Sequence, residues 1–474
     1  MMRFVKRFFY IGKILRQIDN RAGWQVGERP RASASRGSGP APAAAAGEAW
    51  RCSLGAGAGF GGWAPAVAAG GAWRPGRALF DGTPLDTIQR MTRTYFDWAA
   101  TTPPFPELYN ILAQAPFGNP SSRHREGREA RQALEDARRR CAQVLGVKPE
   151  QLIFTSGGTE SNALALQSLL VRHSTAGLLY GATEHPSVRE NAEQLQRLYI
   201  PVASIPAERD GRIGIEAVLK TMEKARERNL PVRMLAIMAV NNETGAITDI
   251  ETIVQTVRQL PGPALHIHTD LVQTIGKVPF SLAGSGIDSA AISAHKLGGP
   301  RGIGLLYLKR PLIPLTRGGE QEWGFRPGTE NVAGALAMAY CLEQLATPDK
   351  LVKHYEAAQQ RMAQLISGLK KSGNCMLIPE DRQEQDPRFS PYILQAAFPG
   401  IPGEVMVRAL DDAGIAISTG SACSSGKIER PVLKAMGIDA DTSFCSVRFS
   451  QGWATTEQDI ETLLHAVSTI RKTL

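Results

Sequence analysis

Short apolar runs alternate with amphipathic stretches between about residue 94 and residue 347, and this pattern predicts the fold. Each run is bounded by glycine or by polar residues, as expected for buried strands. The predicted strands cover residues 151–156, 178–182, 234–240, 265–268, 289–292 and 304–308. Between them the charged residues recur at helical spacing, most clearly over residues 126–145. Strands that alternate with helices predict an α/β fold with a mostly parallel sheet covered on both faces.

The pattern changes after Thr347, where a long helical stretch over residues 350–371 precedes shorter strands and helices to the end of the chain. We interpret this part as a smaller α+β domain. A short strand-like segment at Tyr95 precedes the large domain. The predicted division is therefore a large domain over residues 106–347 and a small domain that combines residues 91–105 with 348–474.

Residues 1–90 have a different composition. They begin with a basic segment whose apolar residues are loosely helical, and continue with Ala-, Gly-, Pro- and Arg-rich sequence. Such sequence buries too little apolar surface to offset chain entropy, so we predict a disordered extension. One interpretation is an organellar targeting segment. The other is an extension without a structural role, which the position of Met91, directly before the organised sequence, supports. We favour the second interpretation, which predicts a cytoplasmic protein; the first predicts an organellar one.

The net charge of +9 does not indicate a nucleic-acid-binding protein. Residues 1–90 hold 13 Lys/Arg and 5 Asp/Glu, or +8, which leaves +1 for the rest of the chain. The folded body therefore lacks a basic surface for nucleic acid. No apolar run is long enough to span a membrane. The six cysteines show no metal-ligand spacing and no CxxC pair, so we expect no metal site and a reducing compartment.

Polar residues follow several predicted strands and indicate the chemistry. Asp270 closes one apolar run, and another run leads into Lys296 within a glycine-rich turn. A lysine that forms a Schiff base and a carboxylate that holds a pyridinium nitrogen are what pyridoxal 5'-phosphate requires. The segment Thr155-Ser-Gly-Gly-Thr159 joins a strand to a helix and can present backbone N–H groups to a phosphate, although ordinary strand–helix connections use the same residues.

A family resemblance rests on ten segments in order. They are FDWAATTP, FGNPSSRH, FTSGGTESN, ATEHPSV, VNNETG, HTDLVQTIGK, SAHKLGGPRGIG, RPGTEN, STGSACSSG and VRFS. Residues 94–474 resemble the cysteine desulfurases, fold-type I pyridoxal-phosphate enzymes related to class V aminotransferases, and in particular the longer-loop group used in iron–sulfur cluster assembly. The resemblance implies a large domain with a mostly parallel seven-stranded sheet, a smaller C-terminal domain and a homodimer.

The resemblance also implies roles for individual residues. Lys296 would bind the cofactor covalently and move protons, Asp270 would pair with the pyridine nitrogen, and His185 would stack on the ring and act in catalysis. Gln273 and Asn242 would contact the phenolic oxygen. The phosphate would be bound by Gly158, Thr159, Ser293 and His295, and by Thr329 from the other subunit. Arg448 would bind the substrate carboxylate. We interpret His124, His266 and His268 as structural.

Cys423 decides between reactions. It lies in Gly420-Ser-Ala-Cys-Ser-Ser-Gly426, a stretch of small residues that suits a mobile thiol, which must first attack a sulfur atom and then deliver it. The other cysteines are interpreted as structural, with Cys445 the one further thiol of interest because it lies near Arg448 in the sequence. From Cys423 to Gly437 the sequence is one residue shorter than is usual in the longer-loop group, which leaves the acceptor open.

The expected reaction converts L-cysteine to L-alanine and leaves the sulfur as a persulfide on Cys423. The sulfur would pass to an acceptor protein, such as an iron–sulfur scaffold or a tRNA-thiolation carrier. A selenocysteine lyase, or another class V pyridoxal-phosphate aminotransferase, is the alternative among enzymes. A non-catalytic relative that acts as a binding partner would be free to lose Lys296, Asp270, Cys423 or Arg448, and this chain keeps them all.

Overall fold

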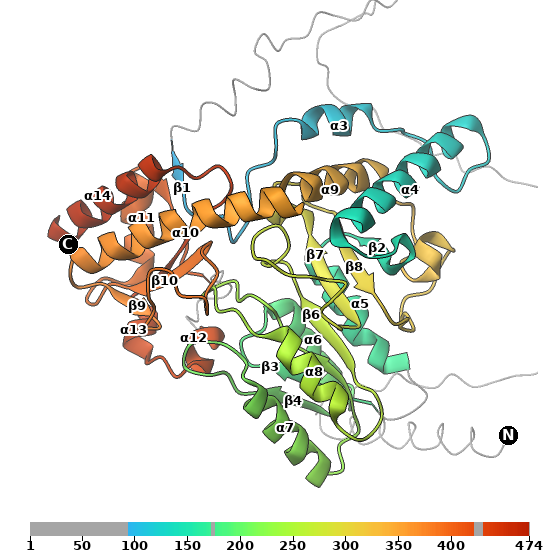
Figure 1. Ribbon diagram of the computed structural model, residues 1–474, viewed down its shortest axis with the longest axis horizontal. Helices are drawn as coiled ribbons and strands as arrows, with labels where there is room; N and C mark the ends of the chain where they lie inside the picture. The colour runs from blue at the N-terminus through green and yellow to red at the C-terminus, as the bar shows by residue number, and fades with distance from the viewer. Residues whose placement is uncertain (1–92, 172–175, 421–429, 474) are drawn as a thin grey trace, which may run out of the picture. The chain divides into compact units, whose positions relative to one another are not determined.

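The computed structural model describes residues 93–171, 176–420 and 430–473 (Figure 1). The predicted extension over residues 1–90 lies outside these ranges. The described strands are β1 (Thr94–Tyr95), β2 (Leu152–Thr155), β3 (Gly177–Gly181), β4 (Val202–Ile205), β5 (Val232–Ala236), β6 (His266–Asp270), β7 (Ser289–Ser293), β8 (Gly304–Leu308), β9 (Met376–Ile378), β10 (Ile393–Ala397), β11 (Ile415–Ala416) and β12 (Ser446–Ser450).

The helices lie in the connections between these strands, as the sequence pattern predicts, except for α14, which follows the last strand. They are α3 (Leu108–Gln114), α4 (Arg125–Leu145), α5 (Gly158–Gln167), α6 (Pro186–Arg197), α7 (Ile215–Glu227), α8 (Ile250–Gln259), α9 (Val332–Leu345), α10 (Pro348–Lys371), α11 (Gly403–Asp412), α12 (Pro431–Ala435), α13 (Ala440–Phe444) and α14 (Glu457–Thr473). His124 caps the N-terminus of α4, where its Nδ1 accepts a hydrogen bond from the backbone N–H of Gly127.

The main sheet has seven strands in the order β2-β8-β7-β6-β5-β3-β4. The neighbouring pairs from β7 to β4 are parallel, whereas β8 is antiparallel to both β2 and β7. The connection from β7 to β8 is too short to hold a crossover helix, so the chain reverses its direction there. The prediction of a mostly parallel, seven-stranded sheet is confirmed.

The strands alternate their side chains between two apolar layers. Leu152, Phe154, Leu235 and Ile267 pack with helices α4, α8 and α9 in one core cluster. The intervening side chains, such as those of Ile153, Met234 and Leu306, pack with α5 and α6 on the other face. Burial on both faces explains why the sequence shows continuous apolar runs here and no simple alternation of polar and apolar residues.

The C-terminal part contains two smaller sheets, β12-β10-β9 and β1-β11. Their core includes Phe96, Phe398 and Phe449, packed with residues of α10, α11 and α14. Helix α10 extends from beside α9 to the three-stranded sheet (Figure 1). Because β1 pairs with β11, the first described residues belong to the C-terminal sheets, in line with the predicted domain division, which itself stays a prediction.

Strand β4 was not expected from the residue pattern. It lies at the edge of the sheet, and Ala203 and Val202 are only half-buried, so its apolar signal is weak. Within the part of the chain that the structure describes, no helix is long and apolar enough to cross a membrane.

A buried ion pair fixes β2 against the segment that precedes α9. Arg138 donates two hydrogen bonds to the carboxylate of Glu322, at 2.7 and 2.8 Å, and both side chains are 2 % exposed. Arg138 also donates to the carbonyl of Leu152, and Glu322 accepts from the backbone N–H of Phe154. The pair therefore also satisfies two backbone groups of the strand.

Glu322→Ala is expected to lower the free energy of unfolding by about 3–5 kcal/mol, because it removes the buried partner of Arg138 and leaves only the longer, 3.3 Å contacts with the more exposed Glu135. The matched control is Glu343→Ala. Glu343 binds Arg140 through two hydrogen bonds as well, but both side chains are 33 % exposed, and the loss should be about 0–1 kcal/mol. Chemical denaturation of the two variants measures the difference, and equal losses would contradict the burial argument.

Candidate active site

A cavity of about 320 Å³ lies at the carboxyl ends of the strands of the main sheet and collects most of the predicted site residues. Its lining includes Gly158, Thr159, His185, Asn242, Asp270, Gln273, Ser293, His295 and Lys296. Ala99, Ala100, Ser187, Met238 and Val272 complete the wall. The sequence placed these residues after separate strands, and the parallel sheet brings the strand ends to one edge.

Lys296 is held at the wall of the cavity by the turn that follows β7. Its Nζ donates hydrogen bonds to the carbonyl of Ala99 and, at 2.6 Å, to that of Ala100. Burial lowers the pKa of Lys296 to about 8, and the positive charge of Arg448 acts in the same direction. About a tenth of this amine is therefore neutral at pH 7, far more than for an ordinary lysine, and the neutral form is the nucleophile.

Asp270 is the last residue of β6 and is 5 % exposed. Its Oδ1 accepts a hydrogen bond from the backbone N–H of Val272 at 2.9 Å, and its Oδ2 accepts one from Nδ2 of Asn162 at 2.8 Å. Each carboxylate oxygen keeps further acceptor capacity. A buried anion at the cavity wall can therefore accept an N–H from a bound ring.

Another part of the cavity wall suits an anion. Helix α5 begins at Gly158, and the N–H groups of a first helical turn have no partner within the helix. Gly158 and Thr159 line the cavity beside Ser293 and His295. Burial lowers the pKa of His295 to about 4, so the ring is neutral at physiological pH. A neutral ring still carries one N–H group that can donate a hydrogen bond. Backbone and neutral donors of this kind bind phosphate groups.

A second lysine lies behind Gln273. Lys277 Nζ donates to Oε1 of Gln273 at 2.6 Å, and Nε2 of Gln273 donates to the carbonyl of Ala99 at 2.9 Å. Burial lowers the pKa of Lys277 well below its usual value, and the charge of Lys296 lowers it further. With Oε1 occupied, the NH₂ end of Gln273 is the end available to a ligand. Asn242 lines the same cavity.

His185 caps the N-terminus of α6, and this contact determines where its proton lies. Its Nδ1 accepts the backbone N–H of Ser187 at 3.1 Å and lies 2.8 Å from Oγ of the same serine. Burial lowers the pKa of His185, outweighing the opposite effect of Asp270. The neutral ring therefore carries its proton on Nε2.

Arg448 lies on β12, is 3 % exposed and is not part of the cavity lining. Its Nη2 binds Oδ1 of Asp97 at 2.6 Å, and its Nη1 donates to the carbonyls of Asn242 and Gly420. Its Nε is buried and has no partner among the residues the structure describes. Arg448 thus joins the cavity residue Asn242 to Gly420, the last described residue before segment 421–429.

The remaining predicted residues are placed differently. Thr329 is exposed and does not line the cavity, so its expected contact with the other subunit stays a prediction. Cys423 lies outside the described residues. Burial raises the pKa of Cys141 and of Cys375 to about 12 and also raises that of Cys341. These three thiols are therefore poor nucleophiles. Cys445 is partly exposed.

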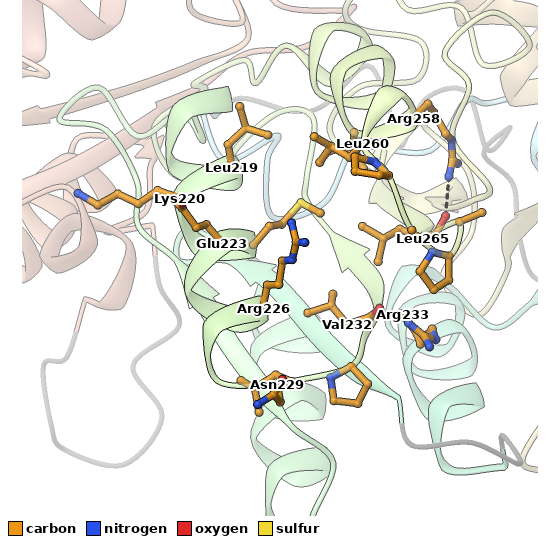
Figure 2. Close-up of a pocket in the computed structure, with 18 residues that line it drawn as sticks. Leu219, Lys220, Glu223, Arg226, Asn229, Val232, Arg233, Arg258, Leu260 and Leu265 are labelled. Carbon is orange, nitrogen blue, oxygen red and sulfur yellow. Dashed lines mark hydrogen bonds between the residues drawn. The ribbon is translucent and has the colours of Figure 1, made fainter.

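A larger hollow, of about 1110 Å³, lies at the opposite ends of the strands (Figure 2). It is an open groove between the C-terminal ends of α7 and α8 and the starts of β5 and β6. Arg226 and Glu223 lie on α7, and Arg258 donates to the carbonyl of Leu265 (Figure 2). The groove contains none of the predicted site residues. The described residues also contain no cluster of three or more His, Cys, Asp or Glu that could hold a metal ion.

Three residues of the site were missed by the sequence analysis. Asn162 binds Asp270, Ser187 binds His185, and Asp97 binds Arg448. All three lie inside segments that carried the family resemblance, namely FTSGGTESN, ATEHPSV and FDWAATTP. The sequence analysis thus included these residues, but it could not show which residues they contact. Such partners can be far apart in the sequence, as Asp97 and Arg448 are, at a separation of 351 residues.

The donor set fits pyridoxal 5'-phosphate. A lysine with a depressed pKa lines a cavity that also holds a buried carboxylate, an amide, a neutral imidazole and a helix N-terminus. These groups suit the parts of the cofactor: the lysine suits its aldehyde, the carboxylate its pyridine nitrogen, the amide its phenolic oxygen, and the imidazole and helix N-terminus its phosphate. Fold and site therefore define the class as that of fold-type I pyridoxal-phosphate enzymes.

Comparison with known proteins specifies the family. The profile of "Aminotransferase class-V" matches residues 94–463. "Cysteine desulfurase IscS" of Dictyoglomus turgidum is 34 % identical over 384 residues, covering 79 % of this chain and 94 % of the relative. A solved "NIFS-LIKE PROTEIN" superposes with a TM-score of 0.72 at 31 % identity, covering 81 % of this chain and 100 % of the other. The structure titled "SspA in complex with cysteine" has a TM-score of 0.63 at 27 % identity, with coverage of 75 % and 98 %. The chain belongs to the class V aminotransferase family, in its cysteine desulfurase branch.

Proposed function

We propose that this protein is a pyridoxal-phosphate-dependent cysteine desulfurase that converts L-cysteine to L-alanine and transfers the sulfur to Cys423. The observation that carries the proposal is the cavity in which Lys296, Asp270 and His185 meet beside a helix N-terminus. The cysteine desulfurase relatives support the same activity. The structure of a relative with bound cysteine supports the substrate.

The cofactor supplies an electron sink that weakens bonds at the α-carbon of the bound amino acid. The chain supplies the other requirements. Lys296 offers a neutral amine for covalent attachment and for proton transfer, because burial lowers its pKa to about 8. Asp270 holds the ring nitrogen, and Gln273 and Asn242 lie where they can contact the phenolic oxygen. His185 presents an N–H at Nε2, since its Nδ1 accepts from Ser187.

Substrate binding is assigned to Arg448 and sulfur transfer to Cys423. The unpartnered Nε–H of Arg448 can donate a hydrogen bond to the substrate carboxylate, with the guanidinium oriented by Asp97. The Cys423 thiolate forms an S–S bond with the substrate sulfur while the substrate Cβ–S bond breaks. The electron pair of that bond stays with carbon, which takes up a proton to give alanine. The products are alanine and an enzyme persulfide, so atoms and electrons balance.

The test is the product formed by purified protein loaded with pyridoxal phosphate. We expect L-cysteine to give alanine, with sulfide released in an equal amount when a thiol reductant is present. Transamination would give a keto acid in place of alanine and would overturn the proposal in favour of an aminotransferase. Competition between cysteine and selenocysteine distinguishes a desulfurase from a selenocysteine lyase, for which selenocysteine would be strongly preferred.

The pH dependence of cofactor attachment follows from the lowered pKa of Lys296. The neutral amine is the reactive form, and its fraction rises as pH increases through about 8 rather than through the usual 10.5. We expect the attachment rate of pyridoxal phosphate to rise about tenfold per pH unit well below this value and to level off above it. Stopped-flow absorbance with cofactor-free protein measures the profile, and a midpoint near the usual value would contradict it.

The remaining features of the proposal concern partners and location. A residue that binds the cofactor phosphate of another subunit must be exposed in a single chain. Thr329 is exposed, and this supports a homodimer. The acceptor of the persulfide sulfur is proposed to be a protein such as an iron–sulfur scaffold or a tRNA-thiolation carrier. A cytoplasmic location is proposed on the interpretation that residues 1–90 carry no targeting information.

A further inference from the structure

A buried chain of hydrogen bonds leads away from the cavity beneath Asp270. Nδ2 of Asn162 donates to Oδ2 of Asp270, and Oδ1 of Asn162 lies 2.8 Å from Nε2 of His268. Nδ1 of His268 lies 2.8 Å from Oγ of Ser289, which in turn lies 2.8 Å from Nε2 of His266. Asn162, His268 and Ser289 are fully buried.

The strand geometry explains why these groups meet. Side chains along a strand alternate between the two faces of the sheet. Ile267 packs in the apolar layer with α8 and α9, so His266, His268 and Asp270 share the other face, which α5 covers. Ser289 begins the neighbouring strand β7 and pairs with His268 in register. Polar groups on this buried face need partners, because unpaired ones would cost about 1–3 kcal/mol each.

The chain of bonds has one consistent direction. Turning the Asn162 amide around would put its oxygen against the carboxylate of Asp270, where both atoms are acceptors. The amide nitrogen therefore faces Asp270, and the amide oxygen accepts a hydrogen bond from the Nε2–H of His268. Burial lowers the pKa of His268 to about 3, so the ring is neutral, and its Nδ1 accepts from the Ser289 hydroxyl.

We propose that Asn162, locked by His268, is the positioning residue that holds the Asp270 carboxylate for the ring nitrogen of the cofactor. The second proton of Nδ2 goes to Oγ of Ser187 at 2.8 Å, and Ser187 contacts Nδ1 of His185. One amide thus supports both the group that binds the ring nitrogen and the group that stacks on the ring. His268, interpreted from the sequence as structural, acts on the site through Asn162. This inference rests on the proposed function.

The first test measures cofactor affinity and the state of its ring nitrogen. Asn162→Ala and His268→Phe are expected to weaken binding of pyridoxal phosphate to the cofactor-free protein by about 10- to 100-fold, the range for a hydrogen bond to a charged group. With ¹⁵N-labelled cofactor, the ring-nitrogen resonance should move from the protonated position in the wild type toward the unprotonated one. Loss of stability alone would lower Tm without moving this resonance.

Two comparisons separate positioning from general damage. His268→Gln keeps an N–H donor for the Asn162 oxygen and should stay closer to the wild type than His268→Phe. The double variant Asn162→Ala/His268→Phe should bind the cofactor about as weakly as Asn162→Ala alone, because His268 acts through Asn162. Gln167→Ala is the control. It removes a hydrogen bond to Asn191 from the same helix, α5, away from Asp270, and should leave both readouts unchanged.

The outcomes also separate this inference from the function on which it rests. If the wild type binds pyridoxal phosphate and a folded Asn162→Ala protein keeps both its affinity and a protonated ring nitrogen, the positioning role is overturned and the proposed function stands. If the wild type binds no pyridoxal phosphate, both are overturned. Should Asn162→Ala not fold, the comparison of His268→Gln with His268→Phe decides, since equal behaviour of these two variants would overturn the inference.

Discussion

Cys423→Ser is expected to reduce alanine formation from L-cysteine by on the order of 10⁴-fold or more, since removal of a catalytic nucleophile has effects of this size. A serine hydroxyl cannot form the S–S bond that takes sulfur from the substrate. Intact mass spectrometry after addition of L-cysteine should show a gain of one sulfur atom in the wild type and none in the variant. The absorption spectrum of the bound cofactor should be unchanged, because Cys423 has no assigned role in binding it.

The described residues around segment 421–429 support this expectation. Arg430 Nη1 donates to the carbonyl of Thr419 at 3.0 Å, and Arg448 Nη1 donates to that of Gly420 at 3.2 Å. Both ends of the segment are therefore anchored near the proposed substrate-binding arginine.

Cys445→Ser is the matched control for this experiment. Cys445 is partly exposed and directly precedes β12, which carries Arg448. A general loss of thiol chemistry in this region would affect both variants, whereas a specific nucleophile affects only Cys423→Ser. A sulfur adduct that persists in Cys423→Ser and disappears in Cys445→Ser would move the catalytic role to Cys445.

The fold could be predicted from the sequence where a strand is buried on both faces of the sheet, because such a strand appears in the sequence as a continuous apolar run. Strands β2 and β8 agree with the predicted segments to within one residue at either end. Strand β4 gave too weak a signal because half-buried edge strands lack such a run. The antiparallel direction of β8 depends on strand pairing, which the pattern of one strand does not contain.

The candidate site could be predicted wherever a residue contacts the cofactor directly, and not where it supports another residue. Asp270 and Lys296 follow apolar runs and carry recognisable chemistry. His268 also lies in such a run, and strand alternation puts it on the same face as Asp270. The sequence does not show, however, that α5 covers this face. The partner of His268, Asn162, is 106 residues away in the sequence. Supporting contacts of this kind depend on tertiary packing.

A buried lysine, Lys277, and a half-buried one, Lys296, both lie at the site, and the structure distinguishes their roles. Lys277 and Lys296 both have a lowered pKa, so reactivity alone does not select one of them. Lys296 lines the cavity, whereas Lys277 lies behind Gln273 and donates to its amide oxygen. An aldehyde that binds beside Asp270 and the N-terminus of α5 therefore meets Lys296 and is shielded from Lys277.

Borohydride reduction of the loaded protein should accordingly attach the pyridoxyl group to Lys296 alone, which peptide mass spectrometry can locate. Lys296→Ala is expected to lose this label and to reduce desulfurase activity by on the order of 10⁴-fold or more, because covalent attachment and proton transfer fail together. Lys277→Met should still be labelled at Lys296, since the methionine keeps the volume of the buried side chain but removes its amine. Label on Lys277 in the wild type would contradict the assignment, because the cofactor would then have to bind on the far side of Gln273, away from the carboxylate and the helix N-terminus that define the cavity.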